Sequence, residues 1–187
     1  MARRVSVEIS HGEEGIDVSK YQKALDLKAV AAANPTLTFV IARTGDGKDL
    51  DPDFTRFWSE AKDLGLVRGS YHYFRADRGG KEQAELVLSA IKDFRPGIDI
   101  PPALDFEKGS QVNLPTRDGT YEVYSGSLPE LPIDLIHEEC MEFLTVIEER
   151  LGVTPIVYTG QQFHWVLSQA RPDLAREWGR FPLWTPS

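Results

Sequence analysis

The sequence predicts an α/β fold built on parallel strands, and three observations carry this prediction. Short apolar runs alternate five times with stretches of helical periodicity, and no internal repeat interrupts them. Residues 38–42 form a continuous apolar run, which is typical of a strand covered on both faces. Polar and aromatic residues gather late in the strands, where an α/β barrel has its active-site rim. An open α/β sheet fits the same pattern.

The first half of the chain is expected to hold three strands and three helices. The cleanest helix carries Phe54, Phe57, Trp58, Ala61 and Leu64 at helical spacing, and Gly65 follows it at the C-cap position. A turn is expected at residues 44–47. The expected strands cover residues 15–19, 38–42 and 66–74, and the expected helices cover residues 22–33, 53–64 and 81–94.

The second half continues the alternation after one long interruption. Residues 109–132 show no period and are rich in Gly, Ser and Pro, so we expect a long loop that leaves the fourth strand near the site. The strands expected in this half begin near residues 103, 154 and 181, and the helices cover about residues 134–151 and 161–169.

Asp105 and Glu107 are the residues where the sequence predicts the chemistry. Side chains alternate along a strand, so these acids point one way while Leu104 and Phe106 point the other. Their Cβ atoms should be roughly 6–7 Å apart. The pKa values of two such acids should move apart, so that one holds a proton while the other is ionised. Two solvated carboxylates at a strand end are the alternative that the motif alone leaves open.

The composition is that of one globular domain and excludes several function classes. The chain has 187 residues, of which 41% are hydrophobic and 27% charged. No apolar run is as long as a membrane span, and the first residues lack the apolar segment of a Sec signal. A net charge of −8 disfavours nucleic acid and anionic membranes as partners.

Cysteine, histidine and glycine patterns predict no cofactor. Cys140 is the only cysteine and falls on the apolar stripe of an expected helix, so we expect a buried small hydrophobe. The four histidines show no metal-ligand spacing, so no metal is expected. His72 is expected to have a structural, hydrogen-bonded role. The sequence lacks a glycine-rich nucleotide-binding motif after its first strand.

Five motifs in a fixed order give the chain a resemblance to a known family. They are Gly15-Ile16-Asp17-Val18-Ser19-x-Tyr21-Gln22, Gly69-Ser70-Tyr71-His72-Tyr73-Phe74, Ala103-Leu104-Asp105-Phe106-Glu107, Val157-Tyr158-Thr159 and Leu183-Trp184. In this order they resemble glycoside hydrolase family 25, the Chalaropsis-type lysozymes, which include many phage endolysins. The resemblance covers residues 15–187, after an N-terminal arm at residues 1–14. It implies a flattened, irregular TIM-like (β/α)5(β)3 barrel.

The resemblance also implies an activity and its catalytic residues. Family members hydrolyse the β-1,4 bond between N-acetylmuramic acid and N-acetylglucosamine in peptidoglycan, with retention. Glu107 resembles the general acid, Asp105 its partner, and Asp17 the carboxylate of the first strand. The substrate's own N-acetyl group would act as nucleophile, and an aspartate would stabilise the oxazolinium-like intermediate. Burial and like charges should raise the pKa of at least one acid, with Glu107 as the candidate.

Aromatic residues match the family positions that line the sugar groove. These are Tyr73, Tyr158 and Trp184, whose rings suit the apolar faces of pyranose rings. Both tyrosines could instead be core residues with satisfied hydroxyl groups, and Asp17 could cap the following helix. Arg43 could pair with the acids or form a salt bridge at the rim.

Two features depart from the family pattern. Family members continue past the Leu-Trp strand through two more strands, so we expect either that the last strands of the barrel are missing from this chain or that the barrel is completed differently. The loop at residues 109–132 is longer than usual and should reshape the groove.

Two alternative functions compete with the muramidase. A non-catalytic cell-wall-binding module on the same barrel would have no physical reason to keep three close acids. A chitinase-type barrel would need Asp-x-x-Asp-x-Asp-x-Glu, and Ile100 and Ala103 stand at two of its aspartate positions. We therefore expect a monomeric hydrolase of bacterial peptidoglycan that acts in the periplasm or outside the cell. Since no Sec signal is seen, phage lysis or a specialised secretion route would deliver it.

Overall fold

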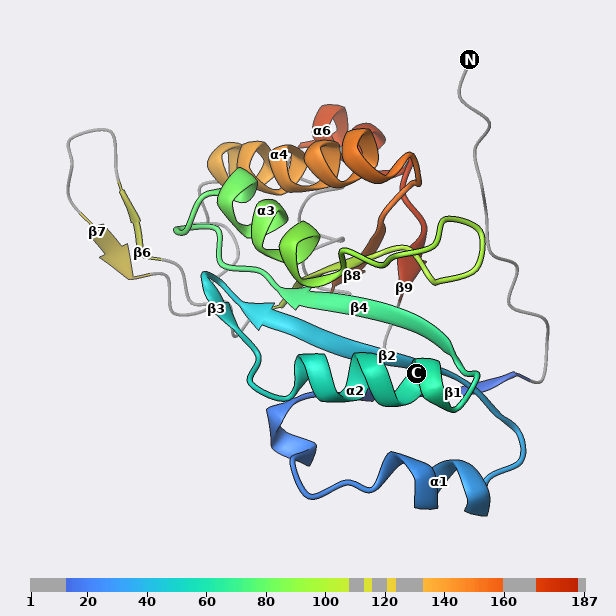
Figure 1. Ribbon diagram of the computed structural model, residues 1–187. Helices are drawn as coiled ribbons and strands as arrows, with labels where there is room; N and C mark the ends of the chain where they lie inside the picture. Colours follow the sequence, from blue (N-terminus) through green and yellow to red (C-terminus); the bar gives the residue numbers. More distant parts are fainter. Residues whose placement is uncertain (1–12, 108–112, 116–120, 124–132, 160–170, 185–187) are drawn as a thin grey trace.

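The computed structural model describes residues 13–107, 113–115, 121–123, 133–159 and 171–184 (Figure 1). The predicted arm at residues 1–14 lies almost entirely outside these residues, as does the helix expected at residues 161–169. Among the described residues, no helix is both long and apolar enough to cross a membrane.

A parallel sheet organises the described chain. Its strands follow the order β1-β2-β4-β5-β8-β9, all parallel to their neighbours, and β3 pairs antiparallel with β2. Parallel pairing arises because each of the main crossovers carries the chain back along the sheet before the next strand begins. The strands are β1 (Glu14–Val18), β2 (Leu37–Asp46), β3 (Asp49–Leu50), β4 (Val67–Tyr73), β5 (Ala103–Phe106), β8 (Ile156–Thr159) and β9 (Leu183–Trp184).

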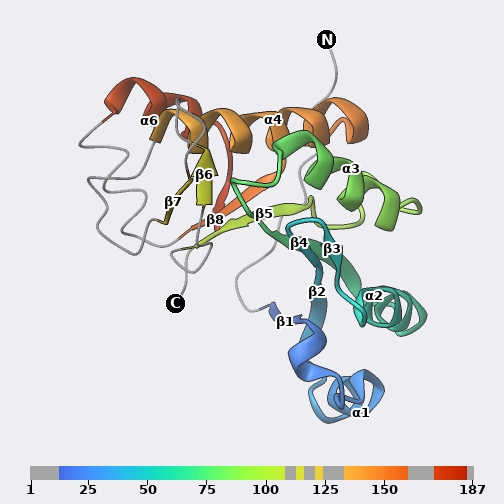
Figure 2. The ribbon, with the colours of Figure 1, turned by 90° about the vertical axis from the view of Figure 1, so that its left-hand side faces the viewer.

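Helices cover the outer side of this sheet, which is curled (Figure 2). Helices α1 and α2 lie along the β1–β2 part, and α3, α4 and α6 along the remainder (Figure 1). Their bounds, together with a 3-10 turn η1, are η1 (Lys20–Gln22), α1 (Leu27–Ala33), α2 (Phe54–Asp63), α3 (Gly80–Ala90), α4 (Ile133–Leu151) and α6 (Pro172–Trp178). The mixed α/β class and the parallel sheet are thus confirmed, with the curl of a half-barrel. The full (β/α)5(β)3 barrel stays a prediction.

The core lies between the sheet and the helices. Leu104 of β5 and Phe143 of α4 are fully buried, and Phe74 packs edge-on against Phe143 with ring centroids 5.7 Å apart. Cys140 is also fully buried on the apolar face of α4, and burial raises the pKa of its thiol. Its predicted role as a small buried hydrophobe is confirmed. These contacts fix β5 on its outer face and leave its inner face for polar side chains.

The helix expected over residues 22–33 begins later than predicted. Ser19 and Gln22 form a capping box around η1, and the chain then runs on to Asp26. The Asp26 side chain accepts a hydrogen bond of 2.9 Å from the Ala29 amide, so α1 begins only at Leu27. Ser19, and not Asp17, caps the turn that follows β1. The alternative role of Asp17 as a cap is therefore wrong.

Three other features differ from the sequence-based expectation. The turn expected at residues 44–47 comes later, because β2 continues to Asp46 and the chain reverses at Gly47, whose φ is +60°. The predicted loop at 109–132 contains a short antiparallel pair, β6 (Asn113–Pro115) and β7 (Tyr121–Val123). Helix α6 was not predicted, although Pro172 at its first turn is a helix-start signal.

Candidate active site

One row of side chains crosses the C-terminal edge of the sheet. Strand pairing aligns one residue from each of five neighbouring strands, namely Asp46, Tyr73, Asp105, Tyr158 and Trp184. Aligned residues on parallel strands point to the same face of the sheet. Leu104 and Phe106, which flank Asp105 in the sequence, are buried in the core beneath the helices. The row therefore faces the inner side of the curl.

A small pocket of about 110 Å³ lies beside this row, and we call it the carboxylate pocket. It brings together residues that are up to 167 positions apart in the sequence, from the ends of β1, β4, β5, β8 and β9. Its lining residues are Asp17, Tyr71, Asp105, Glu107, Tyr158 and Trp184. Five of the six site residues predicted from the sequence thus meet in one pocket, which fits the expectation of a shared rim.

Tyr73 is the predicted site residue that does not line the carboxylate pocket in the described part of the chain. Instead, the Arg75 guanidinium lies over the Tyr73 ring, 4.8 Å from the ring centroid. Tyr71 lines the pocket and was missed by the sequence analysis. Both tyrosines point to one face of β4, because they are two residues apart. That alternation was the available signal, but it does not say which of the two reaches the pocket.

Asp105 and Glu107 form a coupled pair at the end of β5. Asp105 is 4% exposed, and its Oδ1 atom has no hydrogen-bond partner among the described residues. Burial raises the pKa of Asp105 well above its usual range, and the charge of Glu107 and a hydrogen bond with Glu107 raise it further. Two carboxyl groups can share a hydrogen bond only when one of them holds a proton. From the sequence we expected Glu107 to have the raised pKa. In the structure the raised pKa is that of Asp105, because Asp105 is buried inside β5.

Arg43 supplies a buried positive charge beside this pair without binding it directly. Its guanidinium forms a salt bridge of 2.8 Å with Asp51, and both side chains are buried. Its charge still opposes the upward shift in the pKa of Asp105. Of the two alternatives left open for Arg43, the structure shows the salt bridge at the rim.

Tyr71 joins the carboxylates to this positive charge. Burial raises the pKa of its hydroxyl, while the nearby Arg43 opposes the shift and Asp17 and Asp105 add to it. A protonated phenol at this position can donate to a carboxylate or to a bound sugar.

Tyr158 and Trp184 form an aromatic wall on the opposite side of the carboxylate pocket. Their ring centroids are 5.1 Å apart with an angle of 70° between the planes. Burial raises the pKa of Tyr158, and the charge of Glu107 adds to the shift. Both side chains are half-buried, so each ring keeps part of its surface open. Such a wall suits the apolar face of a sugar ring.

His72 has the structural role that the sequence predicts. It is 1% exposed, on the face of β4 opposite Tyr71 and Tyr73, and its Nε2 atom lies 3.3 Å from Oε1 of Gln83. Its ring stacks on Phe143 at a centroid distance of 5.8 Å. Burial lowers the pKa of His72 to about 4. A neutral imidazole facing the core does not take part in the chemistry of the pocket.

The described residues contain no cluster of His, Cys, Asp and Glu side chains able to hold a metal ion. The carboxylate pocket combines an acid with a raised pKa, two further carboxyl groups and an aromatic wall. This set suits proton transfer to a glycosidic oxygen.

A comparison with known sequences identifies the family. The profile of glycosyl hydrolases family 25 matches residues 16–184. The chain belongs to glycosyl hydrolases family 25. It is 30% identical over 184 residues to the protein YegX of Escherichia coli O6:H1, covering 96% of this chain and 58% of YegX. The chain thus spans little more than half the length of this family relative.

Solved structures of the family have a similar fold. A family 25 glycosyl hydrolase from Bacillus anthracis superimposes with a TM-score of 0.69 over 97% of this chain and 74% of its own, at 20% identity. A muramidase from Trichobolus zukalii gives a TM-score of 0.61 over 81% of this chain and 67% of its own, at 27% identity. The predicted resemblance to family 25 is therefore confirmed.

Proposed function

We propose that this chain is an N-acetylmuramidase, a lysozyme of the EC 3.2.1.17 type. It would cleave the β-1,4 bond between N-acetylmuramic acid and N-acetylglucosamine in bacterial peptidoglycan. Membership of family 25 supports a glycoside hydrolase, and the likeness to the Trichobolus zukalii muramidase supports this choice of bond. The observation that carries the proposal is the carboxylate pocket, in which three acids from β1 and the end of β5 face an aromatic wall.

Glu107 is the proposed general acid. It follows the last residue of β5 and is half-buried, whereas Asp105 lies deeper in the sheet, so Glu107 is better exposed to a substrate oxygen. The raised pKa of Asp105, which is coupled to Glu107, keeps a proton within the pair. Glu107 would give this proton to the leaving oxygen as the glycosidic bond breaks.

The geometry of the pair supports a nucleophile supplied by the substrate. Glycosidases that use a carboxylate nucleophile keep their two carboxyl groups about 5–5.5 Å apart, on either side of the sugar. Asp105 and Glu107 are two residues apart at the end of one strand and line the same side of the pocket, so they do not flank a sugar ring from its two faces. The N-acetyl oxygen of the substrate would then attack the anomeric carbon, with retention. Asp105 and Asp17 would orient the acetamido N–H and stabilise the positive intermediate.

The aromatic residues would hold the sugars. Tyr158 and Trp184 offer ring faces for stacking, and the Tyr71 hydroxyl offers a hydrogen bond to an N-acetyl or hydroxyl group. Tyr73 keeps its proposed role in substrate binding, but beside Arg75 and outside the carboxylate pocket. No cofactor is required by this mechanism. The chain would act as a monomer on the cell wall, in the periplasm or outside the cell.

Digestion of purified peptidoglycan tests the proposal. The chain and its Glu107→Gln variant would be incubated with the polymer, and the released fragments identified by mass spectrometry. We expect new reducing-end N-acetylmuramic acid from the unmodified chain and at least about a hundredfold less from Glu107→Gln, since removing general acid catalysis costs about 10²–10⁴-fold. Glu149→Gln is the matched control, because Glu149 is exposed on α4, which covers the outer side of the sheet, whereas the carboxylate pocket lies on the inner side.

Two outcomes would contradict the proposal. Reducing-end N-acetylglucosamine would keep a glycosidase but overturn the choice of bond. Polymer that is bound but not cleaved would instead support the non-catalytic wall-binding module.

A further inference from the structure

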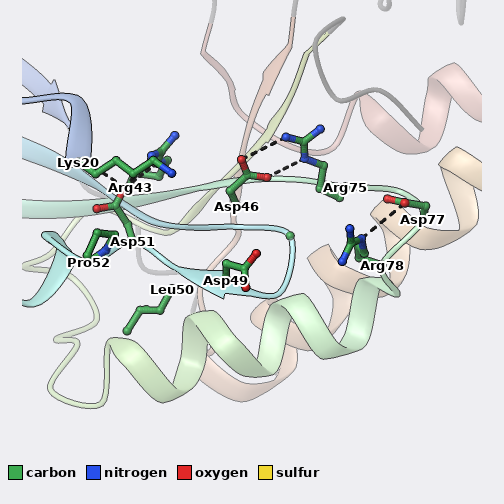
Figure 3. Close-up of a pocket in the computed structure, with 11 residues that line it drawn as sticks. Lys20, Arg43, Asp46, Asp49, Leu50, Asp51, Pro52, Arg75, Asp77 and Arg78 are labelled. Carbon is green, nitrogen blue, oxygen red and sulfur yellow. Dashed lines mark hydrogen bonds and ion pairs between the residues drawn. The ribbon is translucent and has the colours of Figure 1, made fainter. Parts of the chain in front are cut away.

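A second pocket, larger than the carboxylate pocket, lies where β2 turns into β3. We call it the hairpin pocket, and its volume is about 350 Å³, within the range of small-ligand sites. Figure 3 shows its charged side chains converging from η1, the β2–β3 hairpin and the chain after β4. The hairpin itself needs Gly45, because a Cβ atom there would lie 2.5 Å from the Asp49 carbonyl oxygen.

Ion pairs make the frame of the hairpin pocket rigid. Asp51 accepts hydrogen bonds from Arg43 Nε at 2.8 Å and from the Lys20 amide at 3.1 Å. Asp46 accepts two hydrogen bonds from Arg75, at 2.6 and 3.1 Å (Figure 3). Paired charges of this kind hold each other in place and are largely neutralised for any ligand.

Two charges in the hairpin pocket are not neutralised in this way. The Lys20 ammonium forms no salt bridge among the described residues; it lies over the Tyr21 ring, 5.7 Å from the centroid, and its charge lowers the pKa of Asp46 without pairing with it. The Asp49 carboxylate likewise has no cationic partner among the described residues. Leu50, next to Asp49 in the lining, is 49% exposed. An exposed cation, an exposed anion and an apolar side chain would suit a ligand that carries an anion, a cation and a methyl group.

The hairpin pocket adjoins the carboxylate pocket along the same edge of the sheet. Asp46 of β2 lines the hairpin pocket and pairs in register with Tyr73 of β4. Tyr73 in turn pairs in register with Asp105 of β5, which lines the carboxylate pocket. β2 and β5 are therefore two strand spacings apart, about 10 Å. Arg43 also lines the hairpin pocket, and its charge acts on Asp105.

We propose that the hairpin pocket binds the peptide stem of peptidoglycan, with Lys20 pairing with a stem carboxylate and Asp49 with the ammonium group of the diamino acid. This inference rests on the proposed function, since the stem is attached to the N-acetylmuramic acid whose bond is cleaved. Alanine methyl groups of the stem would contact Leu50.

The length of the stem fits the separation of the two pockets. An extended peptide advances about 3.3 Å per residue, so three residues span about 10 Å. The third residue of the stem is the diamino acid, which carries the free ammonium group. A muramic acid bound at the carboxylate pocket would thus bring this group to the hairpin pocket. The chain would then prefer peptide-bearing glycan to a bare polymer.

Binding of two soluble probes tests this inference without any hydrolysis. One is the disaccharide N-acetylglucosaminyl-N-acetylmuramic acid, whose internal bond is not the one proposed to be cleaved. The other is the same disaccharide carrying the stem L-Ala-γ-D-Glu-L-Lys-D-Ala. We expect the stem to lower Kd about tenfold, equivalent to about 1.4 kcal/mol. Lys20→Ala and Asp49→Asn should each remove most of this gain.

Matched controls and a modified probe identify the contacts. Lys92→Ala and Asp63→Asn change exposed residues that follow α3 or end α2, at the opposite edge of the sheet, and should keep the gain. Acetylating the lysine of the stem should weaken binding to the unmodified chain. It should not weaken binding to Asp49→Asn any further, because the two changes remove the same ion pair.

Equal Kd values for the two probes would overturn the inference, as would a gain that survives both Lys20→Ala and Asp49→Asn. A stem that binds equally well after acetylation would also overturn it. Failure of the proposed function has a different signature, namely intact peptidoglycan polymer after incubation. If the stem binds but the polymer stays intact, the proposed muramidase activity is contradicted and the stem-binding pocket is supported. If the polymer is cleaved but the two Kd values are equal, the muramidase activity is supported and the stem-binding pocket is contradicted.

Discussion

His72 should make the stability of this chain depend on pH between about 4 and 6.5. It is buried beside Gln83 and Phe143, and burial lowers its pKa from 6.5 to about 4. Within this interval the unfolded chain binds a proton at His72 that the folded chain does not. The stabilisation is therefore complete above pH 6.5 and is lost as the pH falls through the unfolded pKa toward the folded one.

The size of this loss follows from the two pKa values. A pKa that falls from 6.5 in the unfolded chain to about 4 in the folded chain corresponds to about 3 kcal/mol of stabilisation. At pH 5, where the unfolded residue is almost fully protonated and the folded one almost neutral, the loss is about 2 kcal/mol. This is a large part of the free energy of unfolding of an ordinary domain.

Urea unfolding at pH 7.5 and pH 5.0 measures this effect in the unmodified chain and in His72→Gln. Glutamine keeps a polar group near Gln83 but does not titrate, so the variant should lose about 2 kcal/mol less on acidification. Carboxylates elsewhere contribute equally to both proteins and cancel in the difference. Since the variant could be unstable at every pH, the His72 ring should also be titrated by NMR in the unmodified chain.

Equal losses in the two proteins would refute this reasoning, and so would an NMR titration of His72 with a midpoint near 6.5. Either result would mean that the imidazole meets solvent or an anion in the folded chain. His72 would then return as a candidate for the chemistry at the sheet edge.

Two further changes have defined outcomes. Tyr71→Phe should lower kcat/KM on peptidoglycan about tenfold, because it removes the proposed hydrogen bond from the Tyr71 hydroxyl to the substrate. The thermal unfolding temperature should stay nearly unchanged. An unchanged kcat/KM would exclude a role for the hydroxyl in substrate binding. Asp99→Ala should lower the free energy of unfolding by about 3–5 kcal/mol, because it strips a 2.9 Å salt bridge from Arg68, which is 1% exposed. Urea denaturation measures this loss, and a value below about 1 kcal/mol would contradict it.

The parts of the fold that could be predicted are those whose burial is encoded in a local period. Asp105 and Glu107 reach one pocket while Leu104 lies in the core, as the two-residue period of a strand requires. The α2 helix and the buried Cys140 follow in the same way from the helical period. Motif order then identified the family, which no single motif could have done.

The parts that could not be predicted depend on contacts between distant segments. Tyr71 and Tyr73 share a face, and only the curl of the sheet decides that Tyr71 meets the acids. The partner of Arg43 is Asp51, which the β2–β3 hairpin brings back beside it, and that hairpin was read as a simple turn. The raised pKa of Asp105 depends on how deeply β5 is covered, which the sequence does not state.

The carboxylate pocket divides its tasks along the chain. Its three acids all come before residue 108, whereas both members of its aromatic wall come after residue 150. Under the proposed function, substitutions in β8 and β9 would change which sugars are held while the three acids themselves stay in place. Under the same proposal, a change at the acids of β1 or at the end of β5 would act on bond cleavage directly. An engineer seeking altered wall specificity would begin with the two short C-terminal strands and leave the N-terminal half as it is.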